Sequence, residues 1–109
     1  MAYRLRDFSI SLSSYETALA IEPNSIDARY NFALALKAAG YVPDAVVELR
    51  KILASNPNDV RSHLELGNLY SQQLRDVSHA REEYLKVLQL DPGNPQASNI
   101  QFWLSANPQ

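Results

Sequence analysis

The sequence contains no cysteine, and this absence excludes disulfide bonds, thiolate metal ligands and cysteine nucleophiles. The chain also has no large excess of positive or negative charge, because it contains ten Lys and Arg residues and twelve Asp and Glu residues, which gives a formal net charge of -2. Proteins that bind duplex nucleic acid usually show a basic excess, so no nucleic-acid partner is expected. No apolar run approaches the roughly 18 residues that suggest a membrane span, so no membrane partner is expected either.

Residue patterns that carry catalysis or bind cofactors are also lacking. Three glycines in 109 residues leave no glycine-rich phosphate loop. His63 and His79 have no third ligand at helical spacing, which argues against a metal site. We expect both histidines to lie at the surface, and His79 to lie in a loop. Glu82 and Glu83 are adjacent, so they diverge around a helix and form no acid/base pair. We therefore expect no cofactor and no enzymatic activity.

The length and the apolar content are those of one folded domain, residues 1–109. Hydrophobic residues make up 46% of the chain, which is enough for a core. The N-terminal segment lacks an apolar stretch followed by a small-residue cleavage site, so no signal peptide is expected. The compartment stays undetermined.

The most informative feature is a proline that recurs with a period of 34 and then 35 residues. Pro23, Pro57 and Pro92 stand in "LAIEPNS", "LASNPND" and "LQLDPGN". Each proline disfavours a helical conformation in the preceding residue and cannot donate to a helix ladder. The spacing therefore predicts three helix ends of the same kind.

Two residues after each proline stands a residue that favours a helix start. Ser25, Asp59 and Asn94 are all common N-cap residues, and Pro95 fits the first helical position. The chain is thus predicted to form helix pairs joined by a repeated connector.

Apolar residues follow the helical period on both sides of each connector. Before the prolines the spacing is i, i+4, i+7, i+8, and after them it is i, i+4, i+5, i+8. Glycine within a helix costs about 1 kcal/mol relative to alanine, so a neighbouring helix is expected to approach closely at Gly67. The stripes before the prolines are Ser11, Tyr15, Ala18 and Leu19; Ala45, Leu49, Ile52 and Leu53; and Ala80, Tyr84, Val87 and Leu88; those after them are Ala28, Phe32, Ala33 and Leu36, and Ser62, Leu66, Gly67 and Tyr70.

This pattern resembles the tetratricopeptide repeat. The large–small–large order of the first helix is matched by Phe32, Ala33 and Leu36 and again by Leu66, Gly67 and Tyr70. The second helix is matched as well, although Ile52 and Val87 are larger than the usual alanine. The resemblance implies an all-α fold, a right-handed α-solenoid of antiparallel helix pairs.

The resemblance also divides the domain. Residues 7–24 correspond to the second helix of a truncated repeat, residues 25–58 to a full repeat, and residues 59–93 to a full repeat with a one-residue insertion. Phe102 stands where the first helices have Ala33 and Gly67 and is too large for that contact. Residues 94–106 are therefore predicted to form a capping helix, with Ile100 and Trp103 on its buried side.

In this family the first helices line a concave groove that binds an extended peptide or a helix. The resemblance implies a protein or peptide partner here, and a plain solvated face is the alternative. Three groove positions are apolar or aromatic although the core pattern leaves them outside, which favours binding. The implied groove residues are Asp27, Tyr30, Asn31, Leu34, Lys37, Arg61, Leu64, Glu65, Asn68 and Gln72.

Related functions are less consistent with the residues. Co-chaperone members of the family grip a C-terminal carboxylate, and Asn31 and Arg61 fall on matching positions, but Glu65 stands where an arginine is needed. The similar pentatricopeptide repeat binds RNA, which the acidic balance opposes. A structural or oligomerisation segment, or a regulatory arm of a larger protein, remains the alternative. If the apolar stripe of Phe8, Leu12, Tyr15 and Leu19 is open on one side, we expect either that the natural protein continues upstream or that two copies pair as a homodimer through this edge.

Overall fold

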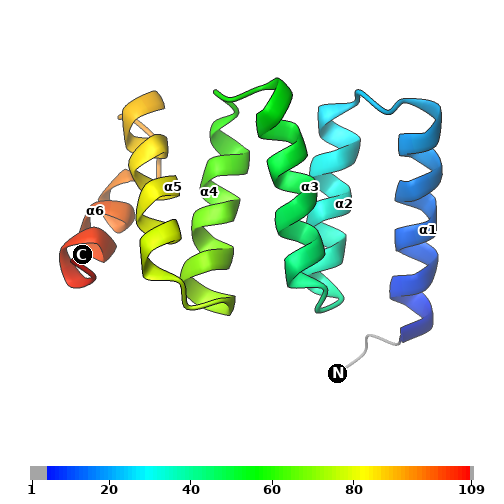
Figure 1. Cartoon of the computed structure of the whole chain (residues 1–109), viewed down its shortest axis with the longest axis horizontal. Helices are drawn as coiled ribbons and strands as arrows, with labels where there is room; N and C mark the ends of the chain where they lie inside the picture. Colours follow the sequence, from blue (N-terminus) through cyan, green and yellow to red (C-terminus); the bar gives the residue numbers. More distant parts are fainter. Residues whose placement is uncertain (1–4, 109) are drawn as a thin grey trace. The chain divides into compact units, whose positions relative to one another are not determined.

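The computed structural model describes residues 5–108, and of residues 5–11 it describes the backbone alone. The chain divides into two compact units, Met1–Ser55 and Asn56–Gln109. The first unit contains α1 (Leu5–Ile21), α2 (Ile26–Ala38) and α3 (Val42–Ser55) (Figure 1). The second contains α4 (Val60–Asn68), its π-helical continuation η1 (Leu69–Gln73), α5 (Val77–Leu90) and α6 (Ala97–Ala106). The described residues contain no strand, so the predicted all-α class of helix pairs is confirmed.

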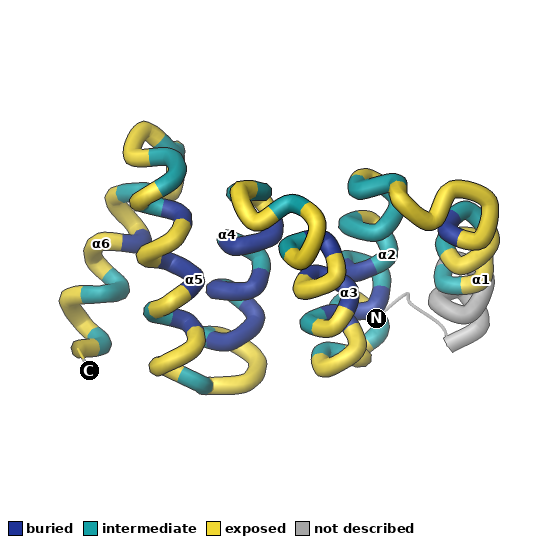
Figure 2. The backbone as a smooth tube through the Cα atoms, turned by 45° about the horizontal axis from the view of Figure 1, so that its top comes forward, coloured by how far each residue is buried: buried dark blue, intermediate teal, exposed yellow. Residues whose placement is uncertain are grey.

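Most of the buried apolar residues are those that the periodicity predicts, whereas Glu48, His63, Leu69 and Glu83 are buried although they belong to none of the predicted stripes. In the first unit α2 packs against α3 through Ala33, Leu36, Ala45, Leu49 and Ile52, all of them buried. In the second unit α4 and α5 bury the corresponding stripes against each other, which Figure 2 shows as dark blue on their facing sides. The predicted stripe residues buried there are Ser62, Leu66, Gly67, Tyr70, Ala80, Tyr84 and Val87.

The apolar stripe of α1 packs against α2. Leu19 is buried, and the rings of Tyr15 and Phe32 lie 6.4 Å apart between centroids. Leu12 and Tyr15 are half-buried, while the side chain of Phe8 lies outside the described residues. The open edge and the homodimer through it stay predictions.

Two of the three expected helix starts differ in detail from the prediction. Ser25 caps α2 as expected, since its hydroxyl accepts a hydrogen bond from the backbone N–H of Ala28 at 3.2 Å. Asp59 instead accepts from the hydroxyl of Ser62 at 2.7 Å and caps no backbone N–H. The placement of Pro95 at the first helical position is wrong, because a turn precedes α6.

That turn forms because Asn94 accepts hydrogen bonds from backbone N–H groups directly after Pro95. Its side-chain oxygen accepts from the backbone N–H of Gln96 at 2.8 Å, and its carbonyl accepts from Ala97 at 2.9 Å. The helix therefore begins two residues after Pro95, at Ala97.

The inserted residue of the second full repeat is absorbed at the end of its first helix. In the first unit Gly40, with a φ of 92°, ends α2, and the N–H of Tyr41 returns to the carbonyl of Leu36 at 2.8 Å. In the second unit the equivalent N–H belongs to Asp76 and donates to the carbonyl of Tyr70 at 2.7 Å. This bond spans one residue more than the bond from Tyr41 to Leu36. Arg75, with a φ of 53°, takes the left-handed place that Gly40 fills. The extra residue widens the last turn into η1.

We expect Gly40→Ala to lower the free energy of unfolding by about 1–2 kcal/mol, because a Cβ is unfavourable at positive φ. Apart from Gly40 and its two chain neighbours, no heavy atom of the described residues lies within 4 Å of the position of that Cβ, so the backbone conformation causes the effect. Urea denaturation followed by circular dichroism measures it. Arg75→Gly is the matched control and should not destabilise in the same way; equal stability of Gly40→Ala and the wild type would contradict the assignment.

Candidate functional site

The second unit contains a hollow of about 480 Å³. Its walls come from α4 and η1 on one side, from α5, and from α6 with the residue that precedes it. The lining residues are Leu64, Asn68, Gln72, Tyr84, Gln96, Asn99, Ile100 and Trp103. We refer to it below as the α4–α6 hollow.

The apolar part of the hollow is formed mainly by α6. Ile100 is 3% exposed, and Trp103 meets the ring of Tyr84 edge-on, with centroids 5.0 Å apart and an interplanar angle of 68°. Ile100 is thus buried as predicted, whereas Trp103 is half-buried and Phe102 is 77% exposed. Edge-to-face aromatic pairs are favourable beyond their buried area, so this contact stabilises α6 on α5.

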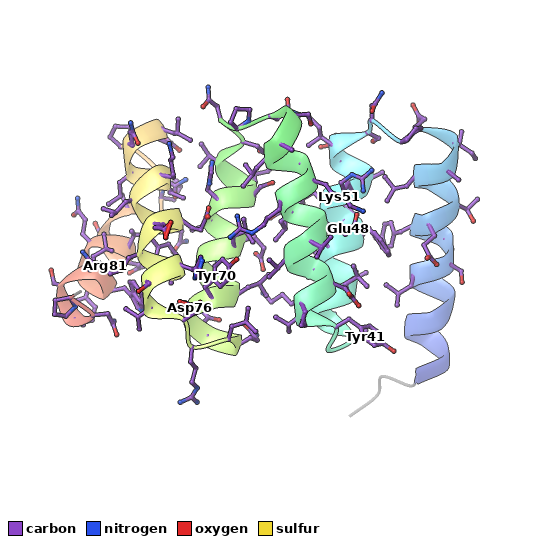
Figure 3. All side chains as sticks on the ribbon, in the orientation of Figure 1. Tyr41, Glu48, Lys51, Tyr70, Asp76 and Arg81 are labelled. Carbon is purple, nitrogen blue, oxygen red and sulfur yellow. The ribbon has the colours of Figure 1, made fainter. Side chains whose placement is uncertain are left out.

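Arg81 of α5 fixes the far end of α6. One nitrogen of its guanidinium, NH1, donates to the carbonyl of Leu104 at 3.0 Å and to that of Asn107 at 2.8 Å. Carbonyl groups in the last turn of a helix have no partner within the helix, and a cation there also suits the helix dipole. Figure 3 labels Arg81 where α5 lies beside α6.

Four carboxamide side chains supply the polar part of the hollow, and none of its lining residues is an acid or a base of the Asp, Glu, Lys or Arg type. The hydroxyl of Tyr84 donates to the side-chain oxygen of Asn68 at 2.6 Å, and Ser71 lies 3.1 Å from the same hydroxyl. Among the described residues, the side-chain nitrogen of Asn68 donates to no protein group. Asn99 donates to the side-chain oxygen of Gln96 at 2.9 Å.

The pKa of Tyr84 is raised from its ordinary value of 10.0. Burial of the phenol is the largest cause, and the negative charge of Glu65 adds to it, while the hydrogen bond with Ser71 acts in the opposite direction. The hydroxyl is therefore held in its neutral form, which is the form that donates to Asn68.

This shift predicts a loss of stability in alkaline solution. As pH rises above about 10, the unfolded chain releases the phenolic proton of Tyr84 before the folded chain does, so unfolding becomes more favourable until the folded pKa is passed. Tyr84→Phe should lower stability at neutral pH by about 0.5–1.5 kcal/mol, through the lost hydrogen bonds, but should fall less steeply with pH. Urea denaturation of both proteins between about pH 8 and pH 11 tests this. Parallel pH profiles would contradict it.

Of the ten groove residues predicted from the sequence, Leu64, Asn68 and Gln72 line the hollow. Arg61 and Glu65 lie on α4 outside the lining. The other five, Asp27, Tyr30, Asn31, Leu34 and Lys37, lie on α2 in the first unit, where Asp27 and Asn31 are exposed and the remaining three are half-buried.

Both histidines differ from their predicted surroundings. His63 is buried, 6% exposed, and its ring nitrogens lie 2.7 Å from Oε1 of Glu83 and 2.7 Å from the carbonyl oxygen of Pro57. The prediction that it lies at the surface is wrong. His79 is exposed as predicted but belongs to the first turn of α5, not to a loop.

Asp76 caps that first turn of α5. Its carboxylate accepts from the backbone N–H of His79 at 3.2 Å and lies 2.7 Å from the ring nitrogen of the same residue. These two hydrogen bonds hold the pKa of Asp76 below its ordinary value, and the bond from the backbone N–H has the larger effect. The ring of His79 stacks on Tyr70, with centroids 5.0 Å apart. Within the described residues no group of His, Asp and Glu side chains is arranged to hold a metal ion.

A family model described as tetratricopeptide repeat matches residues 6–72, and a second model with the same description matches residues 60–94. The chain belongs to the tetratricopeptide-repeat family, as its residue pattern predicts. Among the helices of the described part, none is both long and apolar enough to span a bilayer.

Similar proteins include Protein O-mannosyl-transferase Tmtc3 of Drosophila melanogaster, 28% identical over 75% of this chain. Two Arabidopsis thaliana proteins are also similar over 72% of the chain: TPR repeat-containing thioredoxin TTL4, at 32% identity, and Inactive TPR repeat-containing thioredoxin TTL3, at 35%. The chain spans only 9% to 11% of the length of these relatives. Tetratricopeptide repeats are typically non-catalytic scaffolds, and the family supports a general role in protein–protein interaction.

Proposed function

We propose that the chain binds a short, extended segment of a partner protein, and that the α4–α6 hollow receives the anchoring residue of that segment. The observation that carries the proposal is the composition of the hollow, four carboxamides around Leu64, Ile100 and Trp103. The exposed face of α4, with Arg61 and Glu65 from the predicted groove, would contact the rest of the segment.

Carboxamides suit a peptide backbone. Each has two donors and one acceptor, so it pairs with the N–H and C=O groups of an extended chain. The free donor of Asn68 is held in place because its oxygen already accepts from Tyr84. A positioned donor loses less conformational entropy when it binds.

The same composition defines the anchor. An apolar side chain would cover Ile100 and Trp103, whereas a carboxylate or an ammonium group would lose water without gaining an ion pair in the lining. The proposed ligand therefore has an uncharged, apolar anchor. From about 3.3 Å of extended chain per residue and helices about 8–10 Å apart, we expect contact with about four to six residues. Because Glu65 balances the charge of Arg61 on α4, affinity should depend weakly on salt.

The protein contains its own reporter, since Trp103 is the single tryptophan and lies in the hollow. The experiment is a fluorescence titration with a library of six-residue peptides whose central residue is Leu, Phe, Asp or Lys. Peptides with Leu or Phe are expected to change the emission of Trp103 and to saturate. Absence of binding by every peptide would contradict the proposal and favour a structural segment or regulatory arm.

Neighbouring glutamines provide a matched pair of variants. Gln72 lines the hollow and Gln73 does not, although both are exposed in η1. Gln72→Ala should weaken the best peptide by about 2- to 12-fold, the equivalent of one hydrogen bond of 0.5–1.5 kcal/mol, and Gln73→Ala should leave it unchanged. Equal effects of the two variants would move the binding site elsewhere.

A further inference from the structure

A second hollow, of about 300 Å³, lies within the first unit. It is formed by α1, α2 and α3, and both α1 and α3 pack on α2. The lining residues are Glu16, Phe32, Leu36, Asp44, Val47 and Glu48. We refer to it below as the α1–α3 hollow.

The apolar half of this lining is partly open to solvent. Leu36 is buried and Phe32 is half-buried, whereas Val47 is 50% exposed. The ring of Phe32 lies beside that of Tyr15, with centroids 6.4 Å apart, so its position is supported by α1. The hollow therefore offers a fixed apolar surface that a ligand can cover.

The other half of the lining is acidic. Glu48 is already engaged, because Arg29 donates to one of its oxygens at 2.6 Å and Lys51 donates to the other at 3.2 Å; Figure 3 labels Glu48 and Lys51 on α3. Glu16 on α1 and Asp44 on α3 are exposed, and among the described residues neither forms an ion pair. The lining contains no Lys, Arg or His that could balance these two carboxylates.

We propose that the α1–α3 hollow is a second docking site, and that it takes the side chain of an arginine from a basic segment of a partner protein. The methylene groups of the arginine lie against Phe32 and Val47, since long basic side chains cover apolar surface while their charged end stays in water. The guanidinium bonds to Glu16 and Asp44, because its planar donors match the geometry of carboxylates. A guanidinium is also attracted to the face of an aromatic ring, which Phe32 supplies.

Other occupants suit this lining less well. An acidic side chain is repelled by Glu16 and Asp44, and an apolar one removes water from both carboxylates without forming an ion pair. Ligand pockets hold about 300–1,000 Å³, so this hollow, at the lower end of that range, has room for one side chain of the partner. Its charge therefore selects a partner opposite in kind to the uncharged anchor proposed for the α4–α6 hollow.

The test is an NMR titration of the ¹⁵N-labelled full chain with a capped peptide in which arginine alternates with alanine. The matched control replaces each arginine by citrulline, which has nearly the same shape but no charge. The backbone amide signals of Glu16, Phe32 and Val47 are expected to shift and saturate with the arginine peptide and to stay in place with the citrulline peptide. Equal shifts with both peptides, or no saturable shift of these signals, would overturn the proposal.

Two glutamates of the first unit provide matched variants. Glu16 lines the hollow and Glu22 does not, although both are exposed. Glu16→Gln should weaken the arginine peptide by about 2- to 5-fold, as expected for the loss of one exposed ion pair, and Glu22→Gln should leave its affinity unchanged. Equal weakening by the two variants would mean that the peptide follows the general negative charge of the chain, and it would overturn the proposal.

Salt separates this site from the α4–α6 hollow. The affinity of the arginine peptide should fall when NaCl is raised from about 0.01 M to about 0.15 M, because the Debye length then shortens from about 30 Å to about 8 Å. Binding of an uncharged peptide, followed through Trp103, should change little over the same range. A salt-independent affinity of the arginine peptide would contradict the ion pairs in the α1–α3 hollow and leave the other site unaffected.

Discussion

Leu49→Ala is expected to lower the free energy of unfolding by about 2–5 kcal/mol, one of the two largest effects that the structure predicts. Leu49 lies on α3 and has no exposed surface. Its neighbours in the α2–α3 core, Ala33 and Ile52, are also buried, so the cavity left by the substitution cannot fill with water or collapse easily. The loss therefore includes both the transfer free energy of the side chain and the cost of the cavity.

Val47 provides the matched control on the same helix. It is 50% exposed, so Val47→Ala should change stability by less than about 0.5 kcal/mol. Urea denaturation followed by circular dichroism measures both variants. If Leu49→Ala were as stable as Val47→Ala, the assignment of the buried face of α3 would be wrong.

The second large effect is expected at Gly67, where α4 meets α5. A Cβ at this position would lie 2.6 Å from two ring carbons of Tyr84, closer than packed atoms approach. The ring cannot easily move aside, because its hydroxyl is bonded to Asn68 and Trp103 packs against it. Gly67→Leu should therefore destabilise by about 1–3 kcal/mol or more through overpacking. A melting curve equal to that of the wild type would exclude the close contact.

The first unit suggests how to relieve this overpacking. At the equivalent positions it has Ala33 and Leu49, a larger residue on the first helix opposite a smaller one on the second. Gly67→Ala and Tyr84→Leu should each destabilise, but the double variant should be more stable than the sum of the two predicts, by about 0.5–3 kcal/mol. Additive effects in this double-mutant cycle would show that the size of the side chain at one position does not limit the size accepted at the other.

The repeat period was sufficient to predict most of the core. Ala33, Leu36, Leu49, Leu66 and Val87 are buried as their 34- and 35-residue spacing indicates. Periodicity succeeds here because each helix buries one face against a neighbour of known position. It could not place the inserted residue, since an extra residue fits into a loop, a bulge or a widened helical turn. The structure has the widened turn, with Arg75 in the left-handed conformation.

The buried contact of His63 with Glu83 was missed because the histidine was expected at the surface. Arg29 of α2 donates to Glu48 of α3 at 2.6 Å at the equivalent place in the first full repeat. Arg29 and His63 are 34 residues apart, and Glu48 and Glu83 are 35 apart, so the pairs recur at the spacing of the apolar core. That recurrence was the available signal. Two different basic residues at one repeat position concealed it.

Three of the predicted groove residues, Leu64, Asn68 and Gln72, line the α4–α6 hollow, and binding of a ligand there stays a prediction. The contributions of Tyr84 and Trp103 were not foreseen as site residues, because both matched core positions of their helices. The position of Asn99 depends on how α6 packs on α5, which Arg81 determines through two carbonyl groups at the end of α6. The earlier repeats contain no equivalent of this contact, so its geometry could not be inferred from the repeat pattern.

The most direct test of the proposed binding surface is an NMR titration of ¹⁵N-labelled protein with the tightest uncharged peptide. Side-chain amide signals from the hollow, those of Asn68, Gln72, Gln96 and Asn99, are expected to shift and saturate together with the indole N–H of Trp103. The signals of Gln73, Gln89 and Gln101, which lie outside the lining, should stay in place. Saturable shifts confined to residues outside the hollow, with those four amides unchanged, would contradict the account.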